Sequence, residues 1–281
     1  MFESILNELA EGIRKGEVVP YLGPGALRGI TDKVSGEQIP ATSDELILAL
    51  NQGQPMAPRL MYEFPRAAMH VELKRGRSAV NRFLTETYGE RQWTRSPVHQ
   101  ALAEMQAPYV IDINRDTQLQ ELYADRAHLL ILGMARIGGT DYRYKLYQYD
   151  GSSYSEIAAE DADTSLPVLF KPMGSPVPEP SYIASDADYV DYITELMGGF
   201  AVPAFVKRRR EGVRYLFIGL RLQRDTERMV MSDLIYANAG SPAGWALIPD
   251  ATPKERRFCA RQGIEVVEAD ISDLMSGLQA A

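Results

Sequence analysis

Short apolar runs alternate along the chain with longer amphipathic segments. The apolar runs lie at 18–22, 108–113, 128–134, 167–170, 214–220, 245–249 and 264–269. Runs of this length, apolar throughout, are typical of parallel strands that are buried on both faces. Helical patterns such as 96–106 and 185–200 lie between several of them, and each begins at a serine that can cap a helix. The alternation predicts an α/β fold with a doubly wound, Rossmann-like parallel sheet.

Two regions interrupt this alternation. Residues 43–100 hold several helical patterns and no strand-like run, which predicts a helical insertion. Residues 141–165 begin with alternating aromatic and polar residues around Asp150-Gly151, a pattern typical of a β-hairpin. Residues 171–181 contain four prolines, so we expect an ordered loop there and no regular structure. We interpret residues 1–281 as one domain that carries both insertions.

Composition and charge narrow the class of protein. Apolar residues make up 45% and charged residues 24% of the chain, ordinary values for a globular protein. The net charge of −8 repels a phosphate backbone, which argues against nucleic acid as a partner. The basic run Lys207–Arg210 is interpreted as a solvated helix end before Gly212. No run is long and apolar enough to span a bilayer and the start lacks a basic, apolar secretory signal, so we expect a cytoplasmic protein without membrane contact.

Cysteine usage bears on metals and redox chemistry. Cys259 is the single cysteine, so the chain has neither an internal disulfide nor a thiolate zinc cluster. Its position among apolar neighbours at helical spacing predicts a buried, structural thiol.

A glycine turn follows the first apolar run. Gly23 and Gly25 stand in the segment VVPYLGPGALRG, where two glycines would let a ligand phosphate approach the backbone at a helix start. The same pattern also occurs in plain tight turns, and Pro24 removes one amide donor. Both interpretations stay open at this point.

The order of several motifs resembles that of the sirtuin-like family along nearly the whole chain. Gly23 and Gly25 match the two glycines of the family's Gly-Ala-Gly-x-Ser loop. Asn114 and Asp116, in PYVIDINRD, match the strand ending Thr-x-Asn-x-Asp, and Gly219, in YLFIGLRLQRD, matches the strand ending Ile-Gly-x-Ser. LFKPMGS is similar to the family's Leu-His-Gly loop, and the terminal RRFCARQGIEVVEAD resembles its last helix and strand.

The resemblance implies a Rossmann-like sheet that binds NAD, with Asn114 and Asp116 at the nicotinamide end and a histidine as base on the ribose hydroxyl. The chain departs from that pattern where Met173 replaces the catalytic histidine, and a thioether cannot accept a proton at neutral pH. It also has Leu27 in place of the loop serine and Leu220-Arg221 in place of a small polar pair. The absent cysteine pairs make the chain most similar in type to the zinc-free bacterial members.

Several side chains keep two interpretations. Arg221 could contact a phosphate or fill the pocket. Asn114, Arg115 and Asp116 could contact nicotinamide or ribose at the carboxyl edge of the sheet, or could cap the following helix. The three histidines, His70, His99 and His128, are interpreted as structural or surface residues.

Three functions fit these observations. The first is a sirtuin-like domain that binds NAD or ADP-ribose without turnover, as a sensor, scaffold or regulatory protein, through Gly23, Gly25, Gly219, Arg221 and the Asn114–Asp116 loop. The second is an NAD glycohydrolase of the bacterial antiphage-defence type, with Asn114 and Asp116 as its catalytic residues and no protein base. The third is an interaction protein whose cleft is closed by Leu27, Met173 and Arg221. We expect a protein partner of unidentified kind, and a homo-oligomer is compatible with the sequence.

Overall fold

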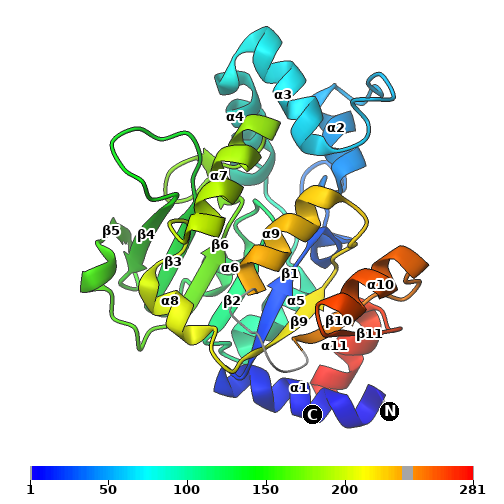
Figure 1. Cartoon of the computed structure of the whole chain (residues 1–281), viewed down its shortest axis with the longest axis vertical. Coiled ribbons are helices and arrows are strands. Elements are labelled where there is room, and N and C mark those ends of the chain that lie inside the picture. Colours follow the sequence, from blue (N-terminus) through cyan, green and yellow to red (C-terminus); the bar gives the residue numbers. More distant parts are fainter. Residues whose placement is uncertain (1, 236–242, 281) are drawn as a thin grey trace.

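The computed structural model describes residues 2–235 and 243–280 and shows helices on both faces of a central sheet (Figure 1). The strands are β1 (Val18–Leu22), β2 (Tyr109–Asp112), β3 (His128–Gly133), β4 (Tyr144–Tyr149), β5 (Tyr154–Glu156), β6 (Val168–Lys171), β7 (Gly174–Ser175), β8 (Ser181–Tyr182), β9 (Arg214–Ile218), β10 (Gly244–Leu247) and β11 (Ile264–Val267). The helices are α1 (Phe2–Lys15), α2 (Ser43–Leu50), α3 (Phe64–Arg75), α4 (Arg77–Thr85), α5 (Pro97–Glu104), α6 (Gln118–Leu122), α7 (Asp186–Gly198), α8 (Ala204–Arg209), α9 (Asp225–Ile235), α10 (Pro253–Arg261) and α11 (Ile271–Ala280).

Nine strands form the central sheet in the order β11-β10-β9-β1-β2-β6-β3-β4-β5. Neighbouring strands from β11 to β3 are parallel, whereas β4 and β5 are added antiparallel at one edge. All seven apolar runs contain strands of this sheet, so the prediction of a doubly wound, Rossmann-like α/β fold is confirmed. The hairpin predicted within 141–165 is confirmed as β4 and β5.

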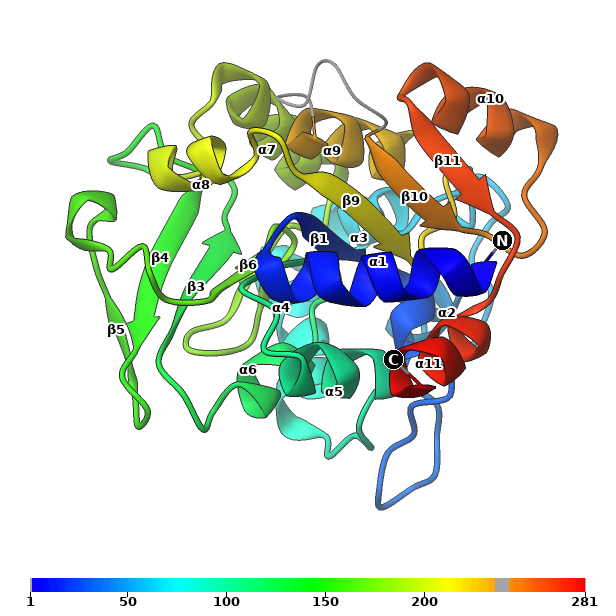
Figure 2. The same cartoon turned by 90° about the horizontal axis from the view of Figure 1, so that it is seen from below.

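The pleat of the strands divides the core between two faces. In β1, Val19 and Tyr21 pack under α7, α8, α9 and α10, whereas Val18 and Leu22 pack against the opposite helices. Those opposite helices are α1, α5, α6 and α11, and α1 packs beside α11 beneath the strands (Figure 2). Because alternate side chains of one strand enter different cores, every residue of β1 is buried.

The helical insertion predicted at 43–100 is confirmed as α2, α3 and α4 with a π-helical turn at Glu86–Glu90, whereas α5, which begins at Pro97, packs on the sheet. Residues 43–96 contain no strand apart from an isolated bridge at Trp93. α2 begins at a capping box in which the Thr42 side chain accepts from Glu45 N and the Glu45 carboxylate accepts from Thr42 N. α3 begins at Phe64, because Pro65 fits the first helical turn, and residues 58–62 before it form turns and bends. The insertion has its own apolar core around Ile47, Ala68 and Leu84.

Two expectations from the sequence need correction, one about the proline-rich stretch and one about the basic run. The proline-rich stretch 171–181 contains a short antiparallel pair, β7 with β8, which Gly174 allows at φ 83°. The basic run does end α8 before Gly212, but it is solvated only in part, since Arg208 is exposed whereas Lys207 and Arg209 are half-buried. Arg209 donates to Pro108 O, and the Arg210 side chain is 6% exposed.

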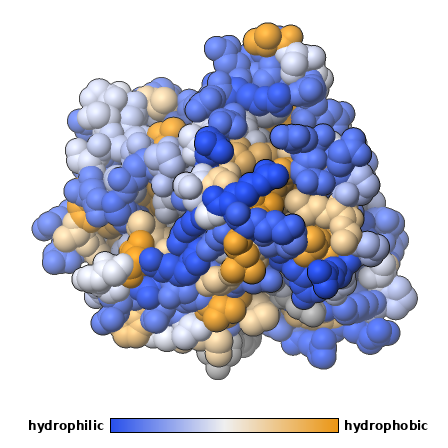
Figure 3. Space-filling model, turned by 90° about the horizontal axis from the view of Figure 1, so that it is seen from above, coloured by the Kyte–Doolittle hydropathy of each residue, from blue (hydrophilic) through white to orange (hydrophobic). Residues whose placement is uncertain are grey.

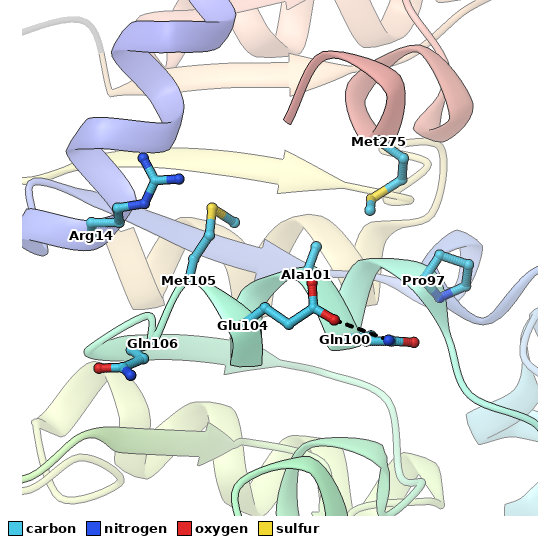
Figure 4. A pocket seen from close by; sticks show the side chains of 8 residues that line it. All are labelled: Arg14, Pro97, Gln100, Ala101, Glu104, Met105, Gln106 and Met275. Atoms are coloured by element: carbon cyan, nitrogen blue, oxygen red, sulfur yellow. Dashed lines mark hydrogen bonds between the residues drawn. The ribbon is translucent and has the colours of Figure 1, made fainter. Parts of the chain in front are cut away.

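In the described parts of the chain, no helix combines the length and the apolar character that crossing a bilayer requires. Seen from the end that carries the helical insertion, the surface is mostly hydrophilic with small separate apolar patches (Figure 3).

Cys259 is fully buried in α10, as predicted, and burial raises the pKa of its thiol to about 11.

Candidate functional site

The carboxyl ends of the parallel strands meet at one edge of the sheet, and a topological switch point lies there between β1 and β9. From β1 the chain continues to β2, β3 and β6 on one side, and from β9 it continues to β10 and β11 on the other. The loops that leave β1 and β9 therefore diverge from adjacent strands. Open α/β sheets bind ligands in the crevice at such a point.

A cavity of about 800 Å³ lies at this switch point, and we call it the switch-point cavity. The loops after β1, β9 and β10 line it, together with the first residues of α2, α5 and α11. Its volume lies within the range typical of small-molecule sites. The amino ends of α2, α5 and α11 carry partial positive charge, which favours an anionic ligand, although the side chains of Thr42, Ser96 and Asp270 already cap one amide of each helix.

Three glycines hold the two loops against each other. Gly23 N donates to Ile218 O and Gly25 N donates to Gly219 O, both at 2.8 Å. A Cβ on Gly25 would lie 2.7 Å from Gly219 Cα, and a Cβ on Gly219, at φ 69°, would lie 2.4 Å from Ala26 N. The glycines are therefore required for loop packing, whether or not a ligand binds. Gly25 and Gly219 also line the switch-point cavity, whereas Gly23 is not among its lining residues.

Arg221 lies in the cavity wall with its guanidinium already paired. Its Nε and Nη2 donate to the two carboxylate oxygens of Glu255 at 3.1 and 3.2 Å, and Nη1 donates to Asp250. Arg221 therefore stiffens the wall between β9 and α10 and keeps two N–H groups for a ligand. Leu27 faces elsewhere, because it is buried in the core of the helical insertion.

The loop after β2 is closely packed. Asn114 Nδ2 donates to Gly23 O at 3.0 Å and to Asp112 Oδ1 at 2.9 Å. Asp116 Oδ1 accepts from Gln118 N at 2.8 Å and so caps the start of α6, as one of the two interpretations expected. Arg115 donates to Ile183 O and lies over the Phe64 ring. Asn114 and Asp116 lie together behind the glycine loop and are not among the residues that line the switch-point cavity.

A buried charge cluster supports this loop from below. Lys171 Nζ lies 2.6 Å from Asp112 Oδ2, and both side chains are fully buried at the ends of the neighbouring strands β6 and β2. His99 Nε2 lies 3.4 Å from the same carboxylate oxygen. Burial alone would raise the pKa of Asp112, but the Lys171 ammonium and the His99 ring outweigh it and hold that pKa below the ordinary range.

The cluster also resembles the donor set of a metal site. His99, Asp112 and Asp116 bring ligand atoms within 4.8 Å of one another. Lys171 Nζ already lies 2.6 Å from Asp112 and 4.0 Å from Asp116. The cation that these carboxylates hold is therefore the lysine ammonium, and a metal ion would first have to displace it.

Met173 follows β6 directly but faces the core. It is 3% exposed, packs under α7 with residues such as Tyr192, and its carbonyl accepts from Ile183 N. It is not among the residues that line the switch-point cavity. His128 is buried and bonded to Tyr154 OH at 2.7 Å, and burial lowers its pKa, which confirms its structural interpretation.

The comparison with protein families decides the assignment. A family model described as SIR2-like domain matches residues 99–267, more than half of the chain. The chain belongs to the SIR2-like family. No curated protein matches this SIR2-like chain. Membership supports an NAD-related fold, and the strand ends that carry Asn114, Met173 and Gly219 all lie within the matched segment.

Sequence reasoning missed two groups at this edge of the sheet. The first is the Lys171–Asp112 pair, whose signal was a charged residue at the end of each of two apolar strand runs. The second is Glu227 in α9, which lines the switch-point cavity without a hydrogen-bond partner for its Oε2 atom among the described residues. An isolated acidic residue in an amphipathic helix gave no signal, because its burial depends on Glu63 and the helical insertion.

Proposed function

We propose that this SIR2-like chain binds a nucleotide of the ADP-ribose type, NAD or ADP-ribose itself, in the switch-point cavity without rapid turnover. It would act as a sensor, scaffold or regulatory protein. The observation that carries the proposal is a cavity of about 800 Å³ between the glycine loops of β1 and β9, at the point where open α/β sheets bind ligands.

The charges around the cavity support an anionic ligand. Arg28, Arg221 and Arg224 line it, and three helices direct their amino ends toward it. Backbone amides and helix dipoles at such ends bind phosphate groups. The acidic residues of the rim are partly neutralised, since Asp250 pairs with Arg221 and Asp44 lies 3.9 Å from Arg224.

Two residues, Met173 and Asn114, support the absence of rapid turnover. Met173 is buried in the apolar core and has no basic atom, so it cannot take a proton from a ribose hydroxyl. Asn114 uses both amide hydrogens within the protein, on Gly23 O and Asp112 Oδ1. Neither residue is therefore free to act on a dinucleotide in the arrangement described.

Calorimetry with the purified chain tests the binding proposal. We expect ADP-ribose and NAD to bind with similar affinity and nicotinamide alone to give no heat. Ser276→Trp places a bulky ring in the cavity from an exposed position on α11 and should weaken binding at least tenfold. Ser78→Trp, at an exposed position on α4, is the matched control and should bind normally. No heat with either nucleotide would contradict the proposal.

A specific observation favours a second candidate, slow NAD hydrolysis. Asp116 Oδ2 is buried beside Asn114, 4.0 Å from Lys171 Nζ, and accepts no hydrogen bond from a described residue, so a hydrogen-bond acceptor is left over at the nicotinamide end implied by the resemblance. Nicotinamide release, followed by chromatography, would support hydrolysis if Asp116→Asn abolished it. That variant keeps the oxygen that caps α6, so folding should be retained. Absence of release at every pH tested would exclude this candidate.

A further inference from the structure

One wall of the switch-point cavity carries an acidic side chain, one of whose carboxyl oxygens has no hydrogen-bond partner in the described parts of the chain. Glu227 projects from α9 into the cavity lining, and its Oε2 atom is shielded from solvent and unbonded to any described residue. Glu63, which immediately precedes α3, is 8% exposed, and its Oε1 atom is likewise unbonded. The two carboxyl groups lie near enough for the Glu63 charge to act on Glu227, and each has one oxygen without a hydrogen-bond partner among the described residues.

Burial and the nearby Glu63 charge raise the pKa of Glu227 to about 8, so Glu227 is mostly a neutral acid at pH 7. Arg224 and Arg228 act in the opposite direction and do not cancel this effect. Arg224 also lies over the Tyr62 ring, and Arg228 donates to Leu222 O. The titratable and charged groups that face Glu227 are Glu63 before α3, Arg224 and Arg228 of the α9 segment, Glu255 of α10, Tyr21 of β1 and Tyr189 of α7.

Protonation of Glu227 accounts for this pair of acidic side chains better than a bound metal ion does. Arg224 and Arg228 already place positive charge beside Glu227, and the third carboxylate nearby, that of Glu255, is held by Arg221. A divalent ion usually needs several oxygen ligands, more than the two unbonded oxygens seen here. A single proton on Glu227 relieves the repulsion between the two carboxyl groups without further ligands.

Protonation changes what the cavity wall can offer. A neutral carboxyl group carries an O–H donor, whereas a carboxylate only accepts hydrogen bonds and repels an anionic ligand. We propose that Glu227 is a nucleotide-binding residue that donates a hydrogen bond from its protonated carboxyl group to an acceptor oxygen of the ligand. This inference rests on the proposed function, since the ligand is the ADP-ribose-type nucleotide of the same cavity.

The consequence is a proton-linked affinity. If only the neutral form binds, the apparent dissociation constant is the intrinsic constant divided by the fraction of Glu227 that is protonated. With a pKa of about 8, the dissociation constant should rise about tenfold between pH 7 and pH 9. ADP-ribose is a suitable probe because it has no group that titrates in this range.

Calorimetry of ADP-ribose binding at pH 7 and pH 9 tests the inference in three variants and the unaltered chain. Glu227→Gln keeps a neutral donor and should bind equally at both pH values. Glu63→Gln removes the repelling charge and should move the loss of affinity to lower pH. Glu265→Gln, which removes an exposed acid of β11 outside the cavity lining, should keep the tenfold dependence of the unaltered chain.

The outcomes separate the inference from the proposed function. No ADP-ribose binding at any pH removes the proposed function and the inference with it. Binding that is equal at pH 7 and pH 9 in the unaltered chain, or that falls equally in Glu227→Gln, overturns the inference alone. A carboxyl carbon NMR titration gives an independent check, because a Glu227 that is ionised at pH 7 in the full chain would also overturn it.

Discussion

The ion pair of Lys171 and Asp112 lies in the interior, where the loss of one charge should have a large effect on stability. Both side chains are 0% exposed, and their charged atoms lie 2.6 Å apart. We consider Lys171→Met, which keeps the length and most of the volume of the side chain. It leaves the Asp112 carboxylate buried with only His99 and Asn114 as partners.

Removing one partner of a buried pair costs about 3–5 kcal/mol, because the remaining charge stays desolvated. Asp112 keeps hydrogen bonds from Asn114, so we expect a value near the lower end, about 3 kcal/mol. For a chain of this size that corresponds to a melting temperature lower by about 5 °C. Urea unfolding followed by circular dichroism gives the free energy, with the denaturant slope unchanged if the native state is otherwise intact.

Two further variants make the experiment decisive. Lys145→Met breaks a partly exposed pair with Glu156 and Glu179, and should cost no more than about 1 kcal/mol. In the double variant Lys171→Met/Asp112→Asn neither charge is left buried alone, so its cost should be smaller than the sum of the single costs. Equal losses for Lys171→Met and Lys145→Met, or strict additivity in the double variant, would refute the reasoning.

The same pair predicts a pH dependence. Asp112 has a lowered pKa in the folded protein, so it contributes stability above the ordinary aspartate pKa of about 4 and loses that contribution as the pH falls below it. The unfolding free energy should therefore fall more steeply between pH 5 and pH 3 in the unaltered chain than in the Lys171→Met/Asp112→Asn variant. Urea titrations at both pH values measure the difference.

Three other predictions follow from single positions. Gly25→Ala should destabilise the fold by more than about 1 kcal/mol in thermal unfolding, because its Cβ would lie 2.7 Å from Gly219 Cα, whereas Gly138→Ala, with nothing within 4 Å, should change little. Cys259 should resist thiol reagents at pH 7.5 until the chain is unfolded, since burial raises its pKa to about 11; rapid labelling of the native chain would contradict this. Met173→His should not produce nicotinamide release, because the side chain at this position faces the core, and release by that single variant would show that Met173 alone blocks turnover.

The sequence predicted those parts of the fold that depend on residues close together in the chain. Each of the seven apolar runs could be recognised as a strand because its neighbours along the chain define its ends, and Ser185 marked the start of α7 for the same reason. The position of β6 between β2 and β3 could not be predicted, since it depends on side chains that meet only in the folded sheet. Lys171 shows the difficulty. It is 59 residues from Asp112 in the chain, and only their pairing explains why a lysine ends a buried strand.

The glycines and Arg210 lie where the sequence indicated, but the contacts that require them there could not be seen in the sequence. Gly23, Gly25 and Gly219 lie at the switch point, but close contact between two loops already requires them, so their presence alone does not argue for a phosphate. Arg210 belongs to a helix end as expected, yet its side chain is buried near Tyr109 and Tyr192. The net negative charge of the chain could not indicate this burial.

The family resemblance implies one continuous nucleotide site. In the structure the residues of that site fall into two separate groups. At the cavity end, Gly25, Gly219 and Arg221 line open space at the switch point. At the other end, Asn114 bonds directly to Gly23 O, and the Lys171–Asp112 pair holds the loop in place from below. Restoring a histidine at position 173 would leave Asn114 and this ion pair unchanged. If the chain binds a nucleotide as proposed, the cavity end would hold it, and chemistry at the other end would require the loop after β2 to move.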